Sequence, residues 1–200
     1  TELSGFRFSK SWADDQRLYF TLKTSHPFND VLQSPPKQGM PGAQKIALNF
    51  INPNNEPIFI KIGISAVDVE GAKKNLEAEI GNQTFEQVKK TAQDFWEKQL
   101  EKIVLEDTNE DNKTNFYTSL YHVSIAPNLY QDVDGRYRGM DLKIHETKDF
   151  DYYTVFSLWD TYRAAHPLYT IIEQDRTNDF INTFLAKYDE GGIMPIWDLA

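Results

Sequence analysis

Residues 58–80 read IFIKIGISAVDVEGAKKNLEAEI, and the hydrophobic period changes inside this stretch. In its first eight residues isoleucine recurs at every second position, which is typical of a strand that buries one face. After Val69 the apolar residues Ala72, Leu76 and Ile80 follow one another at intervals of four, which predicts a helix. We therefore expect a β-region to end and a helical region to begin here.

The residues before this stretch also carry strand signals. Residues 18–24 and 46–51 are rich in apolar and β-branched side chains, as strands are. The segment 52–57, NPNNEP, contains the residue types of a turn and predicts a hairpin that joins strand 46–51 to strand 58–65. A longer loop is expected over residues 34–42, where proline and glycine gather.

The residues after this stretch carry helix signals. Thr84 and Gln87 have the spacing of a capping box, so a second helix is expected after Gly81. Further helices are predicted over residues 113–125, from about residue 158 to an end or kink at His166, and over 177–188 ahead of Gly191 and Gly192. Strands followed by consecutive helices indicate segregated domains, hence an α+β chain rather than an interleaved α/β sheet.

Composition excludes several classes of function. The net charge is -9 and the sequence pI is near 4.9, so phosphate-rich nucleic acid and anionic membrane surfaces would be repelled. No apolar run approaches the roughly 18 residues that a membrane span needs. The absence of cysteine excludes disulfides, thiolate catalysis and zinc sites with cysteine ligands.

The aromatic and acidic run of residues 152–169 suggests a sugar-binding surface. Sugar rings have polar hydroxyls at the rim and apolar C–H bonds on the faces, so their sites combine planar aromatics with hydrogen-bonding groups. Trp159, Asp160 and Arg163 supply this combination within about one helical turn. Ser157 and Asp160 also fit a capping box, so the alternative is that Asp160 only caps a helix and Trp159 only packs.

An acidic loop precedes this run. Asp132, Asp134 and Asp141 are spaced around a glycine in a way that suits a hard cation such as calcium. The twelve-position calcium loop with its bidentate glutamate is missing, however, and Arg136 and Arg138 fall within the run. A turn braced by aspartate–arginine pairs is therefore favoured over a calcium site.

The literal sequence resembles glycoside hydrolase family 92. The segments that carry the resemblance are 116–122 (FYTSLYH), 126–129 (APNL), 132–141 (DVDGRYRGMD), 153–168 (YTVFSLWDTYRAAHPL), 176–180 (RTNDF), 190–192 (EGG), 62–67 (IGISAV), 70–72 (EGA) and the residues Trp12, Ala13, Gln16 and 18–20. They extend over nearly the whole chain and are long enough to be specific. The weakest likeness lies between residues 25 and 45.

This resemblance implies a fold and an activity. Members of the family are calcium-dependent, inverting exo-α-mannosidases whose active site lies between a β-sandwich and an (α/α)6 barrel. By this likeness, residues 1–67 would be the end of the N-terminal β-sandwich, 68–105 a helical linker, and 106–200 the beginning of the catalytic barrel. Because such enzymes are several times longer than 200 residues, we expect the chain to be a fragment.

The resemblance also implies which residues of the active site lie in this chain and which lie outside it. Family members draw the general acid from a Glu-Gly-x-x-Trp-Gln segment, the base from a Gly-Asp-Glu-Asp segment and calcium ligands from an Asn-Glu-Pro segment. The acid and base segments do not occur here, and Glu190 and Asp198 stand in other motifs. An Asn-Glu-Pro triplet is present at residues 55–57, but it lies in the turn predicted between two strands. The likeness therefore implies that this chain carries substrate-recognition residues, namely Trp159, Asp160 and Arg163, while the catalytic residues and the ligands for Ca2+ lie outside it.

We accordingly expect part of a bacterial exo-α-mannosidase that removes terminal α-mannosyl residues from glycans, such as α-1,2-linked mannose. Its partners would be mannose-containing glycans and the remainder of the parent chain. This piece alone would be inactive, because the proton-transfer groups are missing. Family resemblance implies a secreted, periplasmic or cell-surface location. The alternative is a non-catalytic carbohydrate-binding or interaction module that retains the aromatic loop.

Overall fold

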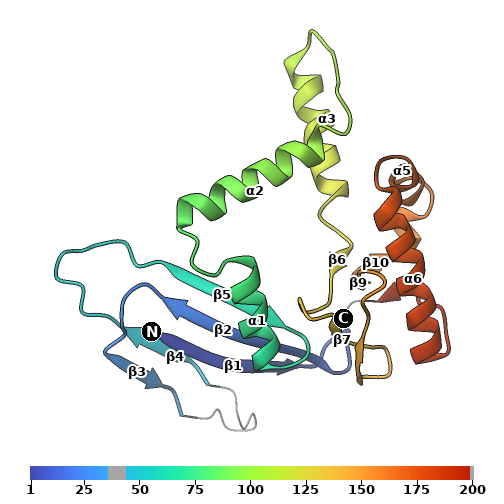
Figure 1. Cartoon of the computed structure of the whole chain (residues 1–200). Coiled ribbons are helices and arrows are strands. Elements are labelled where there is room, and N and C mark those ends of the chain that lie inside the picture. Colours follow the sequence, from blue (N-terminus) through green and yellow to red (C-terminus); the bar gives the residue numbers. More distant parts are fainter. Residues whose placement is uncertain (36–43, 199–200) are drawn as a thin grey trace.

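The structure, a computed structural model, describes residues 1–35 and 44–198. An antiparallel sheet with one helix packed on it lies at one end, two helices lie at the other, and a helical arm rises between them (Figure 1). The helices are α1 (Val69–Glu79), α2 (Phe85–Leu100), α3 (Glu110–Val123), α4 (Leu158–Thr161), α5 (Ala165–Ile172) and α6 (Gln174–Gly191). The α+β character predicted from the sequence is confirmed.

The larger sheet has three antiparallel strands in the order β1–β2–β5, with bounds Glu2–Ser9, Gln16–Thr24 and Ile60–Ser65. Tyr19 at the centre pairs with Phe6 on one side and with Ser65 on the other. The two predicted strands 18–24 and 58–65 are thus confirmed, and the structure pairs them with each other.

The buried face of strand β5 differs from the prediction. Ile60, Ile62 and Ile64 all point to the same face, as their spacing predicts, but each is between 54% and 56% exposed. The opposite face is the one that carries α1, because Gly63 leaves room there: a Cβ at this position would come 2.7 Å from Leu76 Cβ. Helix α1 therefore packs where the strand is smallest, not where it is most apolar.

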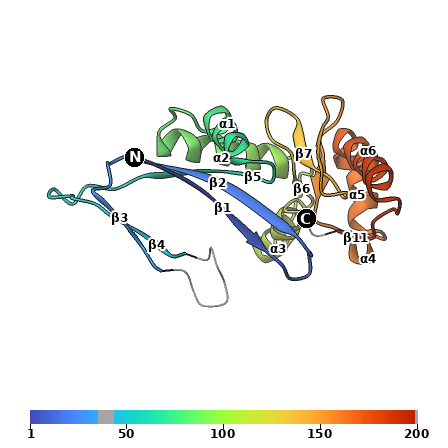
Figure 2. The same cartoon turned by 90° about the horizontal axis from the view of Figure 1, so that it is seen from below.

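The predicted hairpin over residues 52–57 is wrong in its strand pairing. Strand β4 (Ile46–Asn49) pairs with β3 (Asp30–Gln33), whereas β5 pairs with β2. The segment does form a turn, in which Asn52 accepts a hydrogen bond from the Glu56 N–H at 3.0 Å, but this turn connects two different sheets. The β3–β4 pair lies on the side of the main sheet away from α1 (Figure 2). The loop predicted over 34–42 falls mostly on 36–43, outside the described residues.

Local capping chemistry sets the starts of α1 and α2. The Asp68 carboxylate accepts a hydrogen bond from the Gly71 N–H at 2.6 Å. The predicted capping box is present: Thr84 Oγ1 accepts from the Gln87 N–H at 3.3 Å, and the Gln87 side chain accepts from the Thr84 N–H at 2.8 Å. Gly81, with φ of 47°, lies between the two helices in a conformation that glycine readily adopts.

The second half of the chain is built from short strand pairs and helices. Its small sheets are β6 (Asn128–Leu129) with β9 (Tyr153–Thr154), β7 (Arg136–Arg138) with β8 (Ile144–Glu146), and β10 (Phe156–Ser157) with β11 (Trp197–Asp198). Tyr153, Phe156, Tyr169 and Phe180 form its core. Helix α6 ends at Gly192, whose φ is 73°, so the predicted glycine stop is confirmed.

The helix predicted to run from residue 158 to His166 is instead two helices. Helix α4 is a single turn, and α5 starts at Ala165, just before Pro167. Proline is acceptable there because the N–H groups of a helix's first turn have no partner within the helix. Pro167 therefore lies in the first turn of a new helix rather than ending the old one.

A buried polar contact, which we call the Asp132 junction, joins the sheet to the second half of the chain. The Asp132 carboxylate accepts hydrogen bonds from Ser65 Oγ and Asn75 Nδ2, both at 2.8 Å. Asn75 in turn accepts from the Val133 N–H at 2.9 Å. Burial raises the pKa of Asp132, and the bonds from Asn75 and Ser65 oppose that shift. A Cβ at Gly71 would overlap the Asp132 carboxylate, so glycine permits this approach.

The turn that follows is braced by arginine, as the sequence favoured. Arg136 donates from Nη1 to the Asp68 carboxylate at 2.8 Å and from Nε to Asp134 at 3.0 Å. Lys74 also donates to Asp134, at 2.9 Å. The hydrogen bond from Arg136 is the main cause of a lowered pKa for Asp68. Helix α1 is thus tied to strand β7 at its N-terminus.

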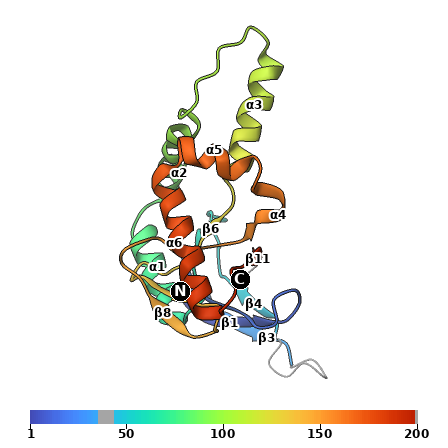
Figure 3. The same ribbon diagram turned by 90° about the vertical axis from the view of Figure 1, so that its right-hand side faces the viewer.

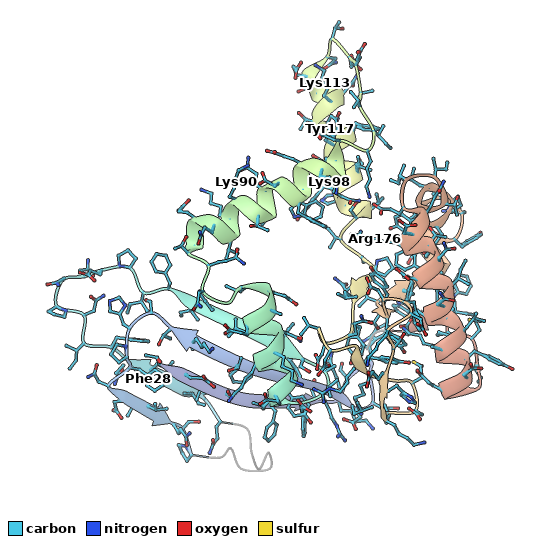
Figure 4. All side chains as sticks on the ribbon, viewed as in Figure 1. Phe28, Lys90, Lys98, Lys113, Tyr117 and Arg176 are labelled. Atoms are coloured by element: carbon cyan, nitrogen blue, oxygen red, sulfur yellow. The ribbon has the colours of Figure 1, made fainter. Side chains whose placement is uncertain are left out.

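A third contact lies where α2 ends. Gln99 and Lys102 both donate hydrogen bonds to Glu173, a buried residue between α5 and α6. Arg176 adds a 3.8 Å ion pair with the same carboxylate, and its side chain extends from α6 toward the chain near α3 (Figure 4). Lys90, Lys98 and Lys113 mark the course of the helical arm in the same view (Figure 4).

Because of the Asp132 junction, we expect Gly71→Ala to destabilise the protein, although glycine-to-alanine changes in helices usually stabilise. Gly71→Ala within a helix would ordinarily stabilise by about 1 kcal/mol. Here the added methyl overlaps the carboxylate, and we expect a loss of about 1–3 kcal/mol in the free energy of unfolding, measured with denaturant. Gly191→Ala in α6 is the control, since its Cβ would meet only Met140 at 3.3 Å. Stabilisation by Gly71→Ala would contradict the junction.

The Asp68–Arg136 pair predicts a pH effect. Because the pKa of Asp68 is lower in the folded than in the unfolded state, its stabilisation is present above about pH 4 and is lost as pH falls through the folded pKa. Asp68→Asn should therefore reduce the dependence of the melting temperature on pH below about 4. Exposed Asp111→Asn serves as the control. An unchanged acid profile in Asp68→Asn would contradict the pairing.

Candidate functional site

The three residues predicted to bind sugar lie together at the surface. Trp159 and Asp160 are in the single turn of α4, and Arg163 follows it. All three are exposed, Trp159 by 75%, so none serves as a core residue. Figure 3 shows α4 at the edge of the second half, with β11 nearby. Trp159 therefore does not pack in the core of the described residues.

The short β10–β11 pair holds this segment in place. Phe156 faces Asp198 across the pair and is buried in the core, whereas Ser157 faces Trp197. The Leu158 N–H donates to the carbonyl of residue 196 at 3.0 Å, which extends the pairing to the start of α4. Successive residues of a strand point to opposite sides. The core thus fixes Phe156, and Ser157 and Trp197 face outward.

The backbone just before this segment is strained. Val155 has φ of 63°, a left-handed conformation in which a β-branched residue is an outlier. Such a conformation costs about 1–3 kcal/mol and persists where the surroundings enforce it, often at functional sites. Here it lies between strands β9 and β10, two residues before Ser157.

The capping alternative for Asp160 is not realised. The hydroxyl of Ser157 donates to Asp160 Oδ2 at 2.6 Å, and the Ser157 side chain accepts no hydrogen bond from the helix backbone. The predicted box therefore forms only a side-chain contact. Asp160 keeps an exposed carboxylate with one oxygen that has no protein donor among the described residues.

A tryptophan from the other end of the chain reaches the same region. The indole of Trp12, in the β1–β2 turn, meets that of Trp197 edge to face, with ring centroids 5.0 Å apart. Buried Arg138 donates from Nη1 to the Asp15 carbonyl at 2.6 Å and from Nη2 to its carboxylate at 3.1 Å. Arg138 therefore anchors the β1–β2 turn, and does not pair within its own loop as its sequence position suggested.

Two nearby carboxylates are already committed to structural contacts. Glu190 accepts hydrogen bonds from the Tyr137 hydroxyl at 2.8 Å, from the Met140 N–H at 2.9 Å and from the Tyr152 hydroxyl at 3.3 Å. Burial and the charge of Glu190 raise the pKa of Tyr137 well above its ordinary value. Asp198 accepts from Thr154 and pairs with a lysine. Both carboxylates act as acceptors in the fold.

That lysine, Lys187, is 1% exposed and is held between aromatic rings. Its ammonium lies 5.3 Å from the ring centre of Tyr152 and 5.0 Å from that of Phe156, and it donates to Asp198. Burial lowers the pKa of Lys187, and the charge of Asp198 opposes this shift. The buried pair connects α6 to β11 and so supports the strand that presents Trp197.

The aspartates of the acidic loop are occupied in a different way from calcium ligands. Asp132 and Asp134 are bound by protein donors as described above, and Asp141 accepts from His145 at 2.9 Å. Within residues 1–35 and 44–198, no three His, Cys, Asp or Glu side chains are arranged so that they could hold a metal ion. Asp132, Asp134 and Asp141 are thus bound by protein donors rather than gathered around a common centre.

Comparison with known proteins identifies the family. A model of the glycosyl hydrolase family 92 catalytic domain matches residues 71–200, more than half of the chain. The chain belongs to glycoside hydrolase family 92. The resemblance noted from the segments above is thereby confirmed. No curated protein matches the sequence. In the part of the chain that the structure describes, no helix is both long and apolar enough to cross a membrane.

Solved structures of family 92 share this fold. The GH92 alpha-mannosidase BT3965 from Bacteroides thetaiotaomicron, in complex with mannoimidazole, is 32% identical with a TM-score of 0.89 over 99% of this chain. The inverting mannosidase BT2199 from the same species (24% identity, TM-score 0.80, 92% covered) and the GH92 hydrolase ccman5 (23%, 0.80, 95%) show the fold. This chain spans 28%, 26% and 27% of their respective lengths.

Sequence reasoning missed two parts of this candidate site. Trp197 and the Lys187–Asp198 pair carry no local signal, because their roles depend on pairing between β10 and β11. Trp12 was noted only as part of the family likeness. The one available hint was that three of the four tryptophans stand in polar or loop surroundings.

From the Lys187–Asp198 pair we expect that removing one charge destabilises the protein more than removing both. Asp198→Ala leaves a buried ammonium without its counter-charge and should cost about 3–5 kcal/mol in the free energy of unfolding. The double variant Lys187→Met with Asp198→Asn removes both charges and should cost less than Asp198→Ala alone. Denaturant unfolding of both proteins measures this difference. Equal stability of Asp198→Ala and the unsubstituted protein would show that the pair is not needed.

Proposed function

We propose that this chain is part of an inverting exo-α-mannosidase and that its exposed α4 segment binds the terminal mannose. The observation that carries the proposal is Asp160: an exposed carboxylate with an available oxygen, oriented by Ser157, next to exposed Trp159. In this arrangement Asp160 accepts hydrogen bonds from sugar hydroxyls, Trp159 covers an apolar ring face, and Arg163 donates to ring substituents. Membership of family 92 supports this assignment.

The proton-transfer groups are assigned to residues outside this chain. Inverting hydrolysis needs a general acid at the leaving oxygen and a general base behind a water molecule. Glu190 accepts three hydrogen bonds within the fold, and Asp198 is buried in an ion pair with Lys187, so we assign neither of them these roles. The chain by itself is therefore expected to bind without hydrolysing. The calcium ligands are likewise assigned to residues outside this chain. The proposed substrate is a glycan with a terminal α-1,2-linked mannose.

The fold is given a corresponding interpretation. We assign residues 1–67 to the end of a β-sandwich, 68–105 to a helical linker and 106–200 to the start of an (α/α)6 barrel. The β3–β4 pair on the isoleucine side of the main sheet supports the first assignment (Figure 2). We also propose, from the family resemblance, a location on the cell surface, in the periplasm or outside the cell.

A non-catalytic carbohydrate-binding module is the second candidate. It is favoured by one observation, namely that the carboxylates near the site are bound in structural contacts. The full-length gene product that contains these residues distinguishes the two. Release of free mannose from an α-mannoside supports the enzyme, whereas mannoside binding without release supports the module.

Asp160→Asn tests the proposed sugar contact. If the carboxylate accepts mannose hydroxyls, kcat/KM of the full-length gene product should fall roughly tenfold or more, equivalent to about 1.4 kcal/mol per decade. If Asp160 acts only at the helix start, the change should cost at most about 1 kcal/mol of stability and leave kcat/KM nearly intact. Asp189→Asn, an exposed aspartate of α6, is the matched control. Unchanged kcat/KM would remove Asp160 from the sugar site.

A further inference from the structure

We propose that Trp12 and Trp197 form a second sugar platform that holds the pyranose next to the mannose bound by Asp160. This inference rests on the proposed function. It assigns a role to two residues from opposite ends of the described chain. The two indoles meet edge to face, with ring centroids 5.0 Å apart and an angle of 80° between their planes.

Both indoles are exposed among the described residues. Trp12 is 75% and Trp197 is 51% exposed. Each therefore has ring surface on which a sugar can lie. The edge-to-face geometry leaves flat ring faces open in two nearly perpendicular directions.

The platform is continuous with the proposed mannose site. Directly opposed residues of a strand pair point to the same side, so Trp197 shares a face with Ser157. The Ser157 hydroxyl donates to Asp160, which places the Asp160 carboxylate by that same face. A sugar attached to the mannose at Asp160 would therefore extend toward the indoles.

The β1–β2 turn brings Trp12 to this place and is fixed there. Arg138 binds Asp15 through two hydrogen bonds, and the Ser11 N–H donates to the Ala13 carbonyl at 3.0 Å within the turn. The end of the described chain lies beside this turn in two perpendicular views (Figures 1 and 2). Rigid placement of this kind lowers the entropy cost of binding.

The ligand class follows from this geometry. Flat, apolar indole faces suit the C–H face of a pyranose, while the hydroxyls at its rim remain in water. Anionic ligands would be repelled by the negative ring faces. We therefore assign the platform to a neutral sugar residue on the leaving-group side of the mannose.

The experiment compares two substrates in the full-length gene product: an α-1,2-mannobiose, which has a second sugar, and methyl α-mannoside, which has none. Trp12→Ala should lower kcat/KM for mannobiose roughly tenfold more than for methyl mannoside. Trp12→Phe retains a planar ring and should restore most of the preference, whereas Trp12→Leu retains only apolar bulk and should not. Phe85→Ala, an aromatic that is 58% exposed on α2, is the matched control.

The outcomes separate this inference from the proposed function. If Asp160→Asn impairs hydrolysis but Trp12→Ala leaves the ratio between the two substrates unchanged, the platform is wrong and the mannose site stands. If the unsubstituted protein hydrolyses neither substrate, mannobiose binding followed by NMR decides. Weaker binding in Trp12→Ala and Trp12→Leu, but not in Trp12→Phe, supports the platform, and equal binding in all four proteins overturns it.

Discussion

The buried carboxylate of Asp132 is the constraint on which the rest of this structure depends. It receives one hydrogen bond from the end of β5 and one from α1, so two consecutive elements meet a loop that lies 67 and 57 residues further along the chain. A carboxylate removed from water is costly unless its oxygens are satisfied. The sheet and the second half of the chain therefore cannot separate without exposing this group or leaving it unpaired. Gly71 is the residue that makes the approach possible.

The placement of the candidate site follows from a chain of such contacts. The Asp132 junction sets the loop that leads to β7, and Arg138 on β7 holds the β1–β2 turn. The core around Phe156 sets β10, and the Lys187–Asp198 pair holds β11 against it. Two independently anchored segments thus converge, one carrying Trp12 and the other Trp197. Neither the main sheet nor the second half of the chain carries both indoles by itself.

Structural features that depend only on residues adjacent in sequence could be predicted. The Thr84 capping box, the glycine stop at Gly192 and the strand character of 58–65 all arise from local chemistry. Strand partners could not be predicted in the same way, because a turn such as 52–57 does not determine whether the strands on its two sides pair with each other. Here β4, the strand before this turn, pairs with β3 instead. The exposed isoleucine face was misassigned because period fixes which side chains share a face, but not which face is covered.

The candidate site shows the same division. The Trp159, Asp160 and Arg163 group was visible as a sequence cluster, and the structure keeps it together at the surface. Whether Asp160 caps a helix depended on the length of α4 and on where the Ser157 hydroxyl points, which spacing does not reveal. The contribution of Trp197 depended wholly on strand pairing.

The Arg138–Asp15 contact also has a consequence for synthesis on the ribosome. The two residues are 123 positions apart, so at typical translation speeds Asp15 emerges roughly 6–25 s before its buried partner. In the folded chain the same carboxylate also accepts hydrogen bonds of 2.9 and 3.1 Å from Arg17, two residues away. Because Arg17 is made with the turn itself, Asp15 has a neighbouring cation in sequence before Arg138 is synthesised.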